Sequence, residues 1–161
     1  MPAFSWSYLN RGNIYFVKMQ AQLATADFDT AFKLRSKMDA LTSHEVYAAL
    51  REHILMQRAG SKSELEQRVL GWDLGKWPGP LINLYLGKIT PGQALATAKE
   101  SSWRERKRQK CAANLYVGLH YLIQGADNEA RSLLEIAANN CHKKSFEYAI
   151  AQSELQLRTE K

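Results

Sequence analysis

The expected fold is decided by the stretch Asn10-Arg-Gly-Asn-Ile-Tyr15 and its continuation Ala26-Asp-Phe-Asp-Thr-Ala31. Apolar residues recur in both at the period of an α-helix, and small residues are placed so that two helices can cross closely. The same spacing returns in residues 111–144, so residues 5–38 and 111–144 are expected to form two similar helix pairs. The small residues in register are Gly12, Ala24 and Ala31 in the first pair and Gly118, Ala130 and Ala137 in the second.

Both segments resemble the tetratricopeptide repeat, a helix pair of about 34 residues with a glycine and a tyrosine in its first helix and alanines and a phenylalanine in its second. Tyr15 and Phe28 take the aromatic places in the first segment. In the second segment Tyr121 takes the tyrosine place, and Leu134 stands where the phenylalanine is expected. The resemblance implies an all-α fold, namely a right-handed superhelix of antiparallel helix pairs, or tetratricopeptide-like α-solenoid.

The rest of the chain also follows the helical period, and strand signals are nearly absent. Capping-box patterns and turn glycines mark where helices begin and end. The predicted helices, nine in all, cover residues 4–18, 21–37, 43–59, 62–72, 79–86, 91–100, 103–124, 127–140 and 145–158.

We expect a single domain over residues 1–161. Between the two clear repeats, residues 43–72 and 78–100 are interpreted as degenerate helix pairs, and residues 145–158 as a C-terminal capping helix. Residues 71–80 form a short stretch rich in Gly and Pro that also contains two tryptophans. This composition predicts a packed turn and not a domain boundary.

Over almost its whole length the chain resembles a proteobacterial tetratricopeptide family that includes the NlpI-type lipoproteins. The stretches that carry this resemblance are the first repeat, Tyr47-Ala-Ala-Leu50, Trp77-Pro-Gly-Pro-Leu-Ile-Asn-Leu-Tyr-Leu-Gly87, Ala113-Asn-Leu-Tyr-Val-Gly-Leu-His-Tyr-Leu122 and Phe146-Glu-Tyr148. The resemblance implies a bacterial adaptor that docks proteases or peptidoglycan hydrolases in the cell envelope, and that in some members forms dimers.

The resemblance also implies which residues meet a partner, because first-helix residues of tetratricopeptide repeats line the concave face of the superhelix. In this chain the residues expected to bind a partner are Trp6, Leu9, Asn13, Phe16, Glu45 and Glu52. Asn13 stands at one position of the clamp that grips a peptide carboxylate, but the matching Lys and Arg are absent. The predicted function is a non-catalytic scaffold that binds a helix or an extended segment of a partner in a groove.

Three explanations are open for the apolar side of the first helix, because no repeat precedes it to cover Trp6, Leu9 and Phe16. Terminal repeats normally carry a polar outer face. This helix could form a homodimer with a second copy, be covered by a segment that precedes Met1, or bury the three side chains against residues 21–37.

The charge of the chain suggests an alternative function. The sequence has 22 Lys and Arg against 16 Asp and Glu, a formal net charge of +6. Five of the cations lie in Trp103-Arg-Glu-Arg-Lys-Arg-Gln-Lys110, and such a run can contact phosphates. Binding of nucleic acid or an anionic surface through residues 104–110 is therefore the alternative. A solvated helix face is the ordinary explanation, and no known nucleic-acid-binding motif accompanies the run.

No sequence pattern indicates an enzyme, and no cofactor is expected. The sequence lacks a His-Glu-x-x-His metal motif, a nucleophile elbow and a glycine-rich phosphate loop. The simplest expectation for Cys111 and Cys141 is two unlinked thiols. Their repeat positions also allow a disulfide or, together with His142, a thiol–histidine pair or a metal site.

The sequence shows no export signal and no apolar run long enough to span a membrane. A cytoplasmic location is therefore the default expectation, and a periplasmic location is expected if residues are missing before Met1.

Overall fold

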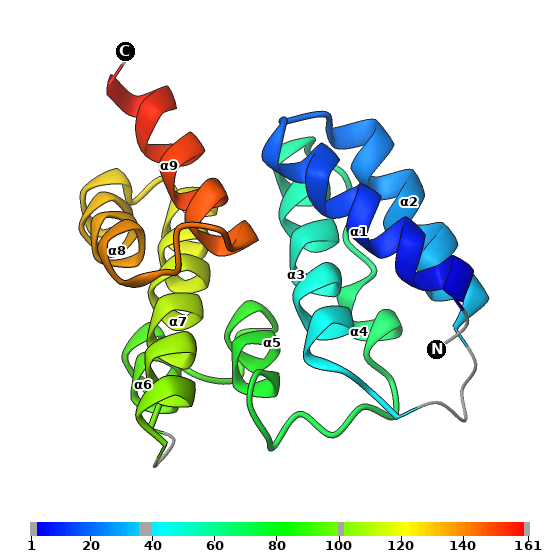
Figure 1. Cartoon of the computed structure of the whole chain (residues 1–161), viewed down its shortest axis with the longest axis horizontal. Helices are drawn as coiled ribbons and strands as arrows, with labels where there is room; N and C mark the ends of the chain where they lie inside the picture. Colours follow the sequence, from blue (N-terminus) through cyan, green and yellow to red (C-terminus); the bar gives the residue numbers. More distant parts are fainter. Residues whose placement is uncertain (1–2, 36–39, 100–101, 160–161) are drawn as a thin grey trace. The chain divides into compact units, whose positions relative to one another are not determined.

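The computed structural model describes residues 3–35, 40–99 and 102–159, and all regular structure in these ranges is helical (Figure 1). The predicted all-α class and the number of helices are confirmed for this part of the chain, in which no strand occurs. The helices are α1 (Ala3–Val17), α2 (Ala21–Leu34), α3 (Ser43–Arg58), α4 (Leu65–Arg68), α5 (Gly79–Tyr85), α6 (Pro91–Ala96), α7 (Trp103–Ile123), α8 (Asp127–Asn140) and α9 (Phe146–Thr159).

The helices divide between two compact units, Met1–Trp72 with α1 to α4 and Asp73–Lys161 with α5 to α9. The division falls inside residues 71–80, the stretch for which the sequence predicts a packed turn. Each unit contains one of the two clear repeats. The expectation that the whole chain acts as one domain, wound as a superhelix, stays a prediction.

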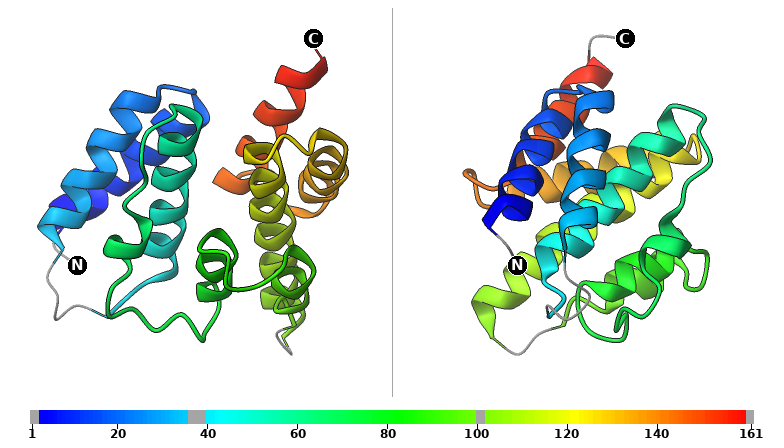
Figure 2. Two further views of the ribbon diagram at one scale, coloured as in Figure 1. Left: turned by 180° about the vertical axis from the view of Figure 1, so that it is seen from behind. Right: turned by 90° about the vertical axis from the view of Figure 1, so that its right-hand side faces the viewer.

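The two clear repeats form helical hairpins with the same close contact at their crossing, and their helices stay side by side when the molecule is turned (Figure 2). A Cβ atom added to Gly12 in α1 would lie 2.7 Å from a ring carbon of Phe28 in α2. A Cβ atom added to Gly118 in α7 would lie 3.2 Å from Cγ of Leu134 in α8. The predicted tight crossing is therefore confirmed in both hairpins.

The turns of the two hairpins are also equivalent. Met19, after α1, has a φ angle of 58°, and Gly125, at the corresponding place after α7, has a φ angle of 75°. Glycine adopts this left-handed conformation freely, whereas a residue with a Cβ atom pays about 1–2 kcal/mol for it. The first turn therefore keeps the repeat geometry in spite of its sequence.

The second helix pair of the first unit departs from the prediction. The capping pattern at Ser61 predicts a helix over residues 62–72, but α4 covers only Leu65–Arg68. The N-cap of α4 is Glu64, and just before it the Ser63 Oγ accepts a hydrogen bond from the backbone N–H of Leu65 at 3.1 Å. The same hydroxyl is hydrogen-bonded to Nδ1 of His53 in α3, which fixes α4 beside α3.

The short helices α5 and α6 cover the first helix of the second repeat. Leu84 of α5, Ala94 of α6 and Val117 of α7 form a buried cluster. The Tyr85 hydroxyl donates a hydrogen bond to the backbone carbonyl of Tyr116 at 2.7 Å. Residues that depart from the repeat pattern therefore still complete the core of the second unit.

A disulfide joins Cys111 in α7 to Cys141 at the end of α8, with their Cα atoms 4.9 Å apart. The simplest expectation, two unlinked thiols, is therefore wrong. The hairpin brings the early part of α7 beside the end of α8, and this proximity permits the bond. With both sulfur atoms bonded, the site offers no thiol to His142.

We expect the double variant Cys111→Ala/Cys141→Ala to lose about 3–4 kcal/mol of unfolding free energy, because the bond closes a loop of about 30 residues in the unfolded chain. Urea denaturation followed by circular dichroism measures the loss. Reductant should destabilise the wild type by a similar amount and leave the double variant unchanged. A wild type that is indifferent to reductant would contradict the disulfide.

Candidate functional site

Most of the side chains that the sequence predicts to meet a partner are buried. Leu9 and Phe16 are each only 1% exposed, and the polar residues Asn13, Glu45 and Glu52 are buried as well. Trp6 is the exception, with 39% of its surface exposed. Of the three explanations for the apolar side of the first helix, burial is the one that describes Leu9 and Phe16.

Two of the buried polar residues use their polar groups within the first unit. The side-chain oxygen of Asn13 in α1 accepts a hydrogen bond from Nη1 of Arg51 in α3 at 2.6 Å. The Glu45 carboxylate accepts a hydrogen bond from the backbone N–H of Thr42 at 2.8 Å, and this bond helps to cap the start of α3. The same carboxylate forms an ion pair with Arg35, the residue after α2. These side chains hold α3 in place and do not offer their polar groups at an open surface.

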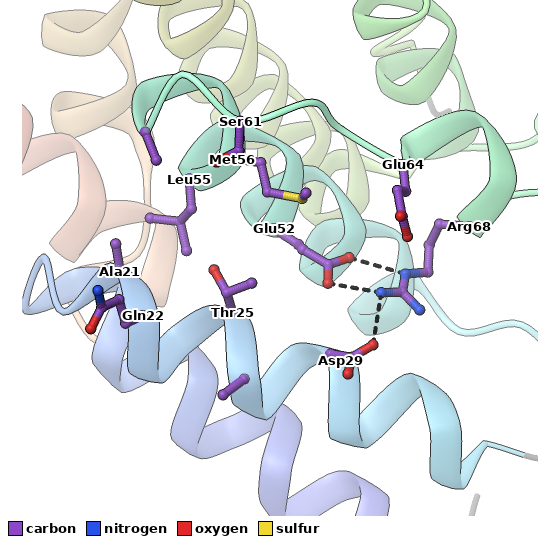
Figure 3. A pocket seen from close by; sticks show the side chains of 12 residues that line it. Ala21, Gln22, Thr25, Asp29, Glu52, Leu55, Met56, Ser61, Glu64 and Arg68 are labelled. Atoms are coloured by element: carbon purple, nitrogen blue, oxygen red, sulfur yellow. Dashed lines mark hydrogen bonds and ion pairs between the residues drawn. The ribbon is translucent and has the colours of Figure 1, made fainter.

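Glu52 lies elsewhere, on the wall of a pocket of about 590 Å³ between α2, α3 and α4 (Figure 3). One end of this pocket is charged, and the rest of its wall combines apolar and polar side chains (Figure 3). Apart from the charged end, the pocket is lined by Ala21, Gln22, Thr25, Ala26, Leu55, Met56, Ala59 and Ser61. The charged end is lined by Asp29, Glu52, Glu64 and Arg68.

Arg68 organises the charged end. Its Nε and Nη2 donate to the two carboxylate oxygens of Glu52 at 3.0 and 2.8 Å, and Nη2 also reaches Oδ1 of Asp29 at 3.5 Å. The guanidinium carbon lies 4.4 Å from the centre of the Phe32 ring. A planar guanidinium suits this combination of a two-pronged carboxylate contact and an aromatic contact. One side chain of α4 therefore ties α2 and α3 together at the pocket.

The two paired carboxylates differ in their pKa. Burial raises the pKa of Glu52, and this effect outweighs the lowering by Arg68. The pKa of Asp29 is lowered, first by its hydrogen bond to Lys33 and also by Arg68. Glu64 is exposed, makes no ion pair within the described part of the chain, and contributes to the raised pKa of Glu52. Of the three carboxylates at the charged end, Glu64 is therefore the one that is exposed and not paired with Arg68 or Lys33.

Within residues 3–35, 40–99 and 102–159, no group of three or more His, Cys, Asp and Glu side chains is placed to hold a metal ion. The helices of the same ranges include none that is long and apolar enough to cross a bilayer.

Sequence reasoning found Glu52 but missed Arg68, Asp29 and the pocket itself. The sequence does contain a signal for the contact between Glu52 and Arg68. In both clear hairpins, residues that meet across the two helices are 16 positions apart: Gly12 meets Phe28, and Gly118 meets Leu134. The same separation relates Glu52 to Arg68. Applied to residues 43–72, it would have paired these two side chains across the degenerate repeat.

No protein-family model matches the sequence. The resemblance to tetratricopeptide proteins therefore stays a prediction, supported by the equivalent crossings and turns of the two hairpins.

The variant Arg68→Met tests the charged end, because it leaves Glu52 buried without its cation. We expect the unfolding free energy at pH 7 to fall by about 2 kcal/mol, since an uncompensated buried charge is costly. Glu52 has a higher pKa in the folded protein than in the unfolded chain. Its protonated form therefore stabilises the fold at low pH, and this stabilisation is lost as the pH rises through the pKa of the folded state. The deficit of the variant should therefore shrink as the pH falls from 7 to 4.

Urea denaturation at pH 4, 5.5 and 7 measures this dependence. Glu52→Gln is the control, because it keeps an acceptor for Arg68 but carries no charge, and we expect it to change the unfolding free energy at pH 7 by less than about 1 kcal/mol. An Arg68→Met deficit that is equal at pH 4 and pH 7 would show that Glu52 is not its cause.

Proposed function

We propose that the protein is a non-catalytic interaction module that binds a segment of another protein in the pocket between α2, α3 and α4. The observation that carries this proposal is the pocket itself. Its volume of about 590 Å³ lies within the range of ligand-binding sites, which is about 300–1,000 Å³. It offers apolar area for affinity, from Leu55 and Met56 among others, and fixed charges for orientation at one end.

The chemistry of the pocket suits a short amphipathic segment. Apolar side chains of the ligand would cover Leu55 and Met56, and methionine adapts its shape to different ligands. Polar or cationic groups of the ligand would meet the carboxylates around Arg68. A helix or an extended segment can present apolar and polar side chains in this order, and peptide-binding grooves commonly recognise their ligands in one of these two forms.

The repeat architecture supports the same proposal. We propose that the two hairpins belong to a tetratricopeptide-like α-solenoid, and proteins built this way bind partners on extended surfaces. The likeness to envelope adaptors extends the proposal to a bacterial scaffold that brings enzymes together and forms homodimers. The exposed apolar residues of the first helix that a second copy would meet are Phe4, Trp6 and Ile14, and Trp6 is in edge contact with His44 at 4.7 Å between ring centres.

The variant Ala26→Trp tests the pocket, because residue 26 is exposed on α2 and lines the pocket. Peptides are first selected on the wild-type protein from a displayed random library and their Kd values are measured by fluorescence anisotropy. We expect Ala26→Trp to weaken binding at least tenfold, which is about 1.4 kcal/mol, because the indole occupies space in the pocket.

Leu23→Trp is the matched control, since residue 23 lies on the same helix, is 49% exposed and does not line the pocket. It should change the Kd by less than about twofold, which is about 0.4 kcal/mol. Equal binding by both variants would place the peptide site elsewhere, and a library that yields no binder would contradict the proposed function.

A further inference from the structure

The first two turns of α7 carry a patch that the pocket does not involve. We call it the α7 basic face; its residues are Trp103, Arg104, Arg106, Lys107, Arg108 and Lys110. All six are exposed, and Trp103 has 70% of its surface open to solvent. Trp103 therefore lies exposed among five exposed cations.

The disulfide shows why this patch is uncovered by the neighbouring helix. Cys141 follows the last residue of α8 and is bonded to Cys111. Residues 103–110 therefore extend beyond the end of α8, over about 12 Å at 1.5 Å per residue. In Figure 1, α8 lies beside the other part of α7.

The charge arrangement of the α7 basic face is unfavourable for the isolated helix. Cations near a helix N-terminus are repelled by the helix dipole. Arg104 and Arg108 stand four residues apart, and like charges at this spacing repel. Within this segment the acidic residue is Glu105, whose contact with Arg108 is long at 3.5 Å. An anionic surface would relieve both repulsions.

Trp103 indicates which anionic surface fits. Indole rings prefer the boundary between water and lipid, where the ring is partly buried and the N–H stays hydrated. Nζ of Lys107 lies 5.7 Å from the centre of the Trp103 ring, so the aromatic group and the cation would reach the same surface together.

The disulfide adds an independent argument. Buried disulfides persist in oxidising compartments and are rare where thiols are kept reduced. Such compartments are bounded by membranes whose headgroups carry phosphate, and nucleic acid is not their usual anionic polymer. Both observations favour a lipid surface over a nucleic acid.

We propose that the α7 basic face docks the protein on the surface of a bilayer that contains anionic lipids. The cations contact lipid phosphates, and the Trp103 side chain inserts at the level of the headgroups. The interaction is peripheral, and clustered Lys and Arg residues provide such attraction near an anionic surface. It is independent of ligand binding in the pocket between α2, α3 and α4.

Sedimentation with vesicles tests the proposal. The full chain is mixed at about 50 mM salt with vesicles of phosphatidylcholine alone or with about 30% phosphatidylglycerol, where attraction is weakly screened. The wild type should bind only the anionic vesicles. The variant Arg104→Gln/Lys107→Gln/Lys110→Gln should bind about 100-fold more weakly, at about fivefold for each cation.

The matched control is Lys88→Gln/Lys143→Gln/Lys144→Gln, which removes three exposed cations from the same unit and leaves the same net charge. It should bind within about threefold of the wild type. Circular dichroism verifies that both variants are folded. Trp103→Ala, which keeps every cation, should weaken binding about five- to tenfold, which gives a second reading if the triple variant is unfolded.

Several results would overturn the proposal: no sedimentation with anionic vesicles, equal losses in the two triple variants, or no loss in Trp103→Ala. Tighter binding to a 20-nucleotide poly-dT strand than to the vesicles would also overturn it, in favour of a nucleic-acid surface.

Discussion

The absence of a side chain at Gly12 is the constraint on which the first unit depends. It lets α1 approach α2 until the Phe28 ring covers the glycine, and no other residue leaves that space. Arg11 flanks this crossing and donates two hydrogen bonds to the buried Asp27 carboxylate, at 2.7 and 2.8 Å. This hydrogen bond and the carboxylate charge raise the pKa of the Arg11 guanidinium. The hairpin is thus fixed by a steric fit and by an ion pair beside it.

The pocket is a consequence of this fixed hairpin. Once α1 holds α2, Asn13 and Arg51 hold α3 against α1, and Arg35 joins the end of α2 to Glu45 of α3. A space remains between α2 and α3, and the short α4 closes it at one end. These contacts occupy Asn13 and Glu45, two of the three polar side chains that the repeat pattern assigns to a binding groove, and Glu52 lines the pocket between α2, α3 and α4.

Most helices could be predicted because their periodicity and capping residues are local in the sequence. Features that depend on contacts between helices could not be predicted in this way. Thr90 and Gln93 form the predicted capping box at the start of α6, and α8 has the predicted bounds. The prediction of a helix over residues 62–72 was wrong at both ends, because α4 covers only Leu65–Arg68. Just before it, the Ser63 hydroxyl is hydrogen-bonded to His53 of α3 and to the N–H of Leu65. The burial of Asn13 depends on Arg51, which is 38 residues away in the sequence and carries no local signal of the contact. To predict a tetratricopeptide superhelix, one must know how the two units are oriented relative to each other. The local periodicity of the sequence carries no information about that orientation.

A double-mutant cycle between Gly12→Ala and Phe28→Leu is the most direct test of the central constraint, because Phe28→Leu reproduces the Gly118–Leu134 contact of the second hairpin. With Phe28 present, Gly12→Ala should lower the unfolding free energy by about 1–3 kcal/mol, since the added Cβ overpacks a buried ring. With leucine at position 28 the loss should shrink by about 1 kcal/mol or more. If alanine instead stabilises both backgrounds by about 1 kcal/mol, as it does at an exposed helical glycine, the close crossing does not exist.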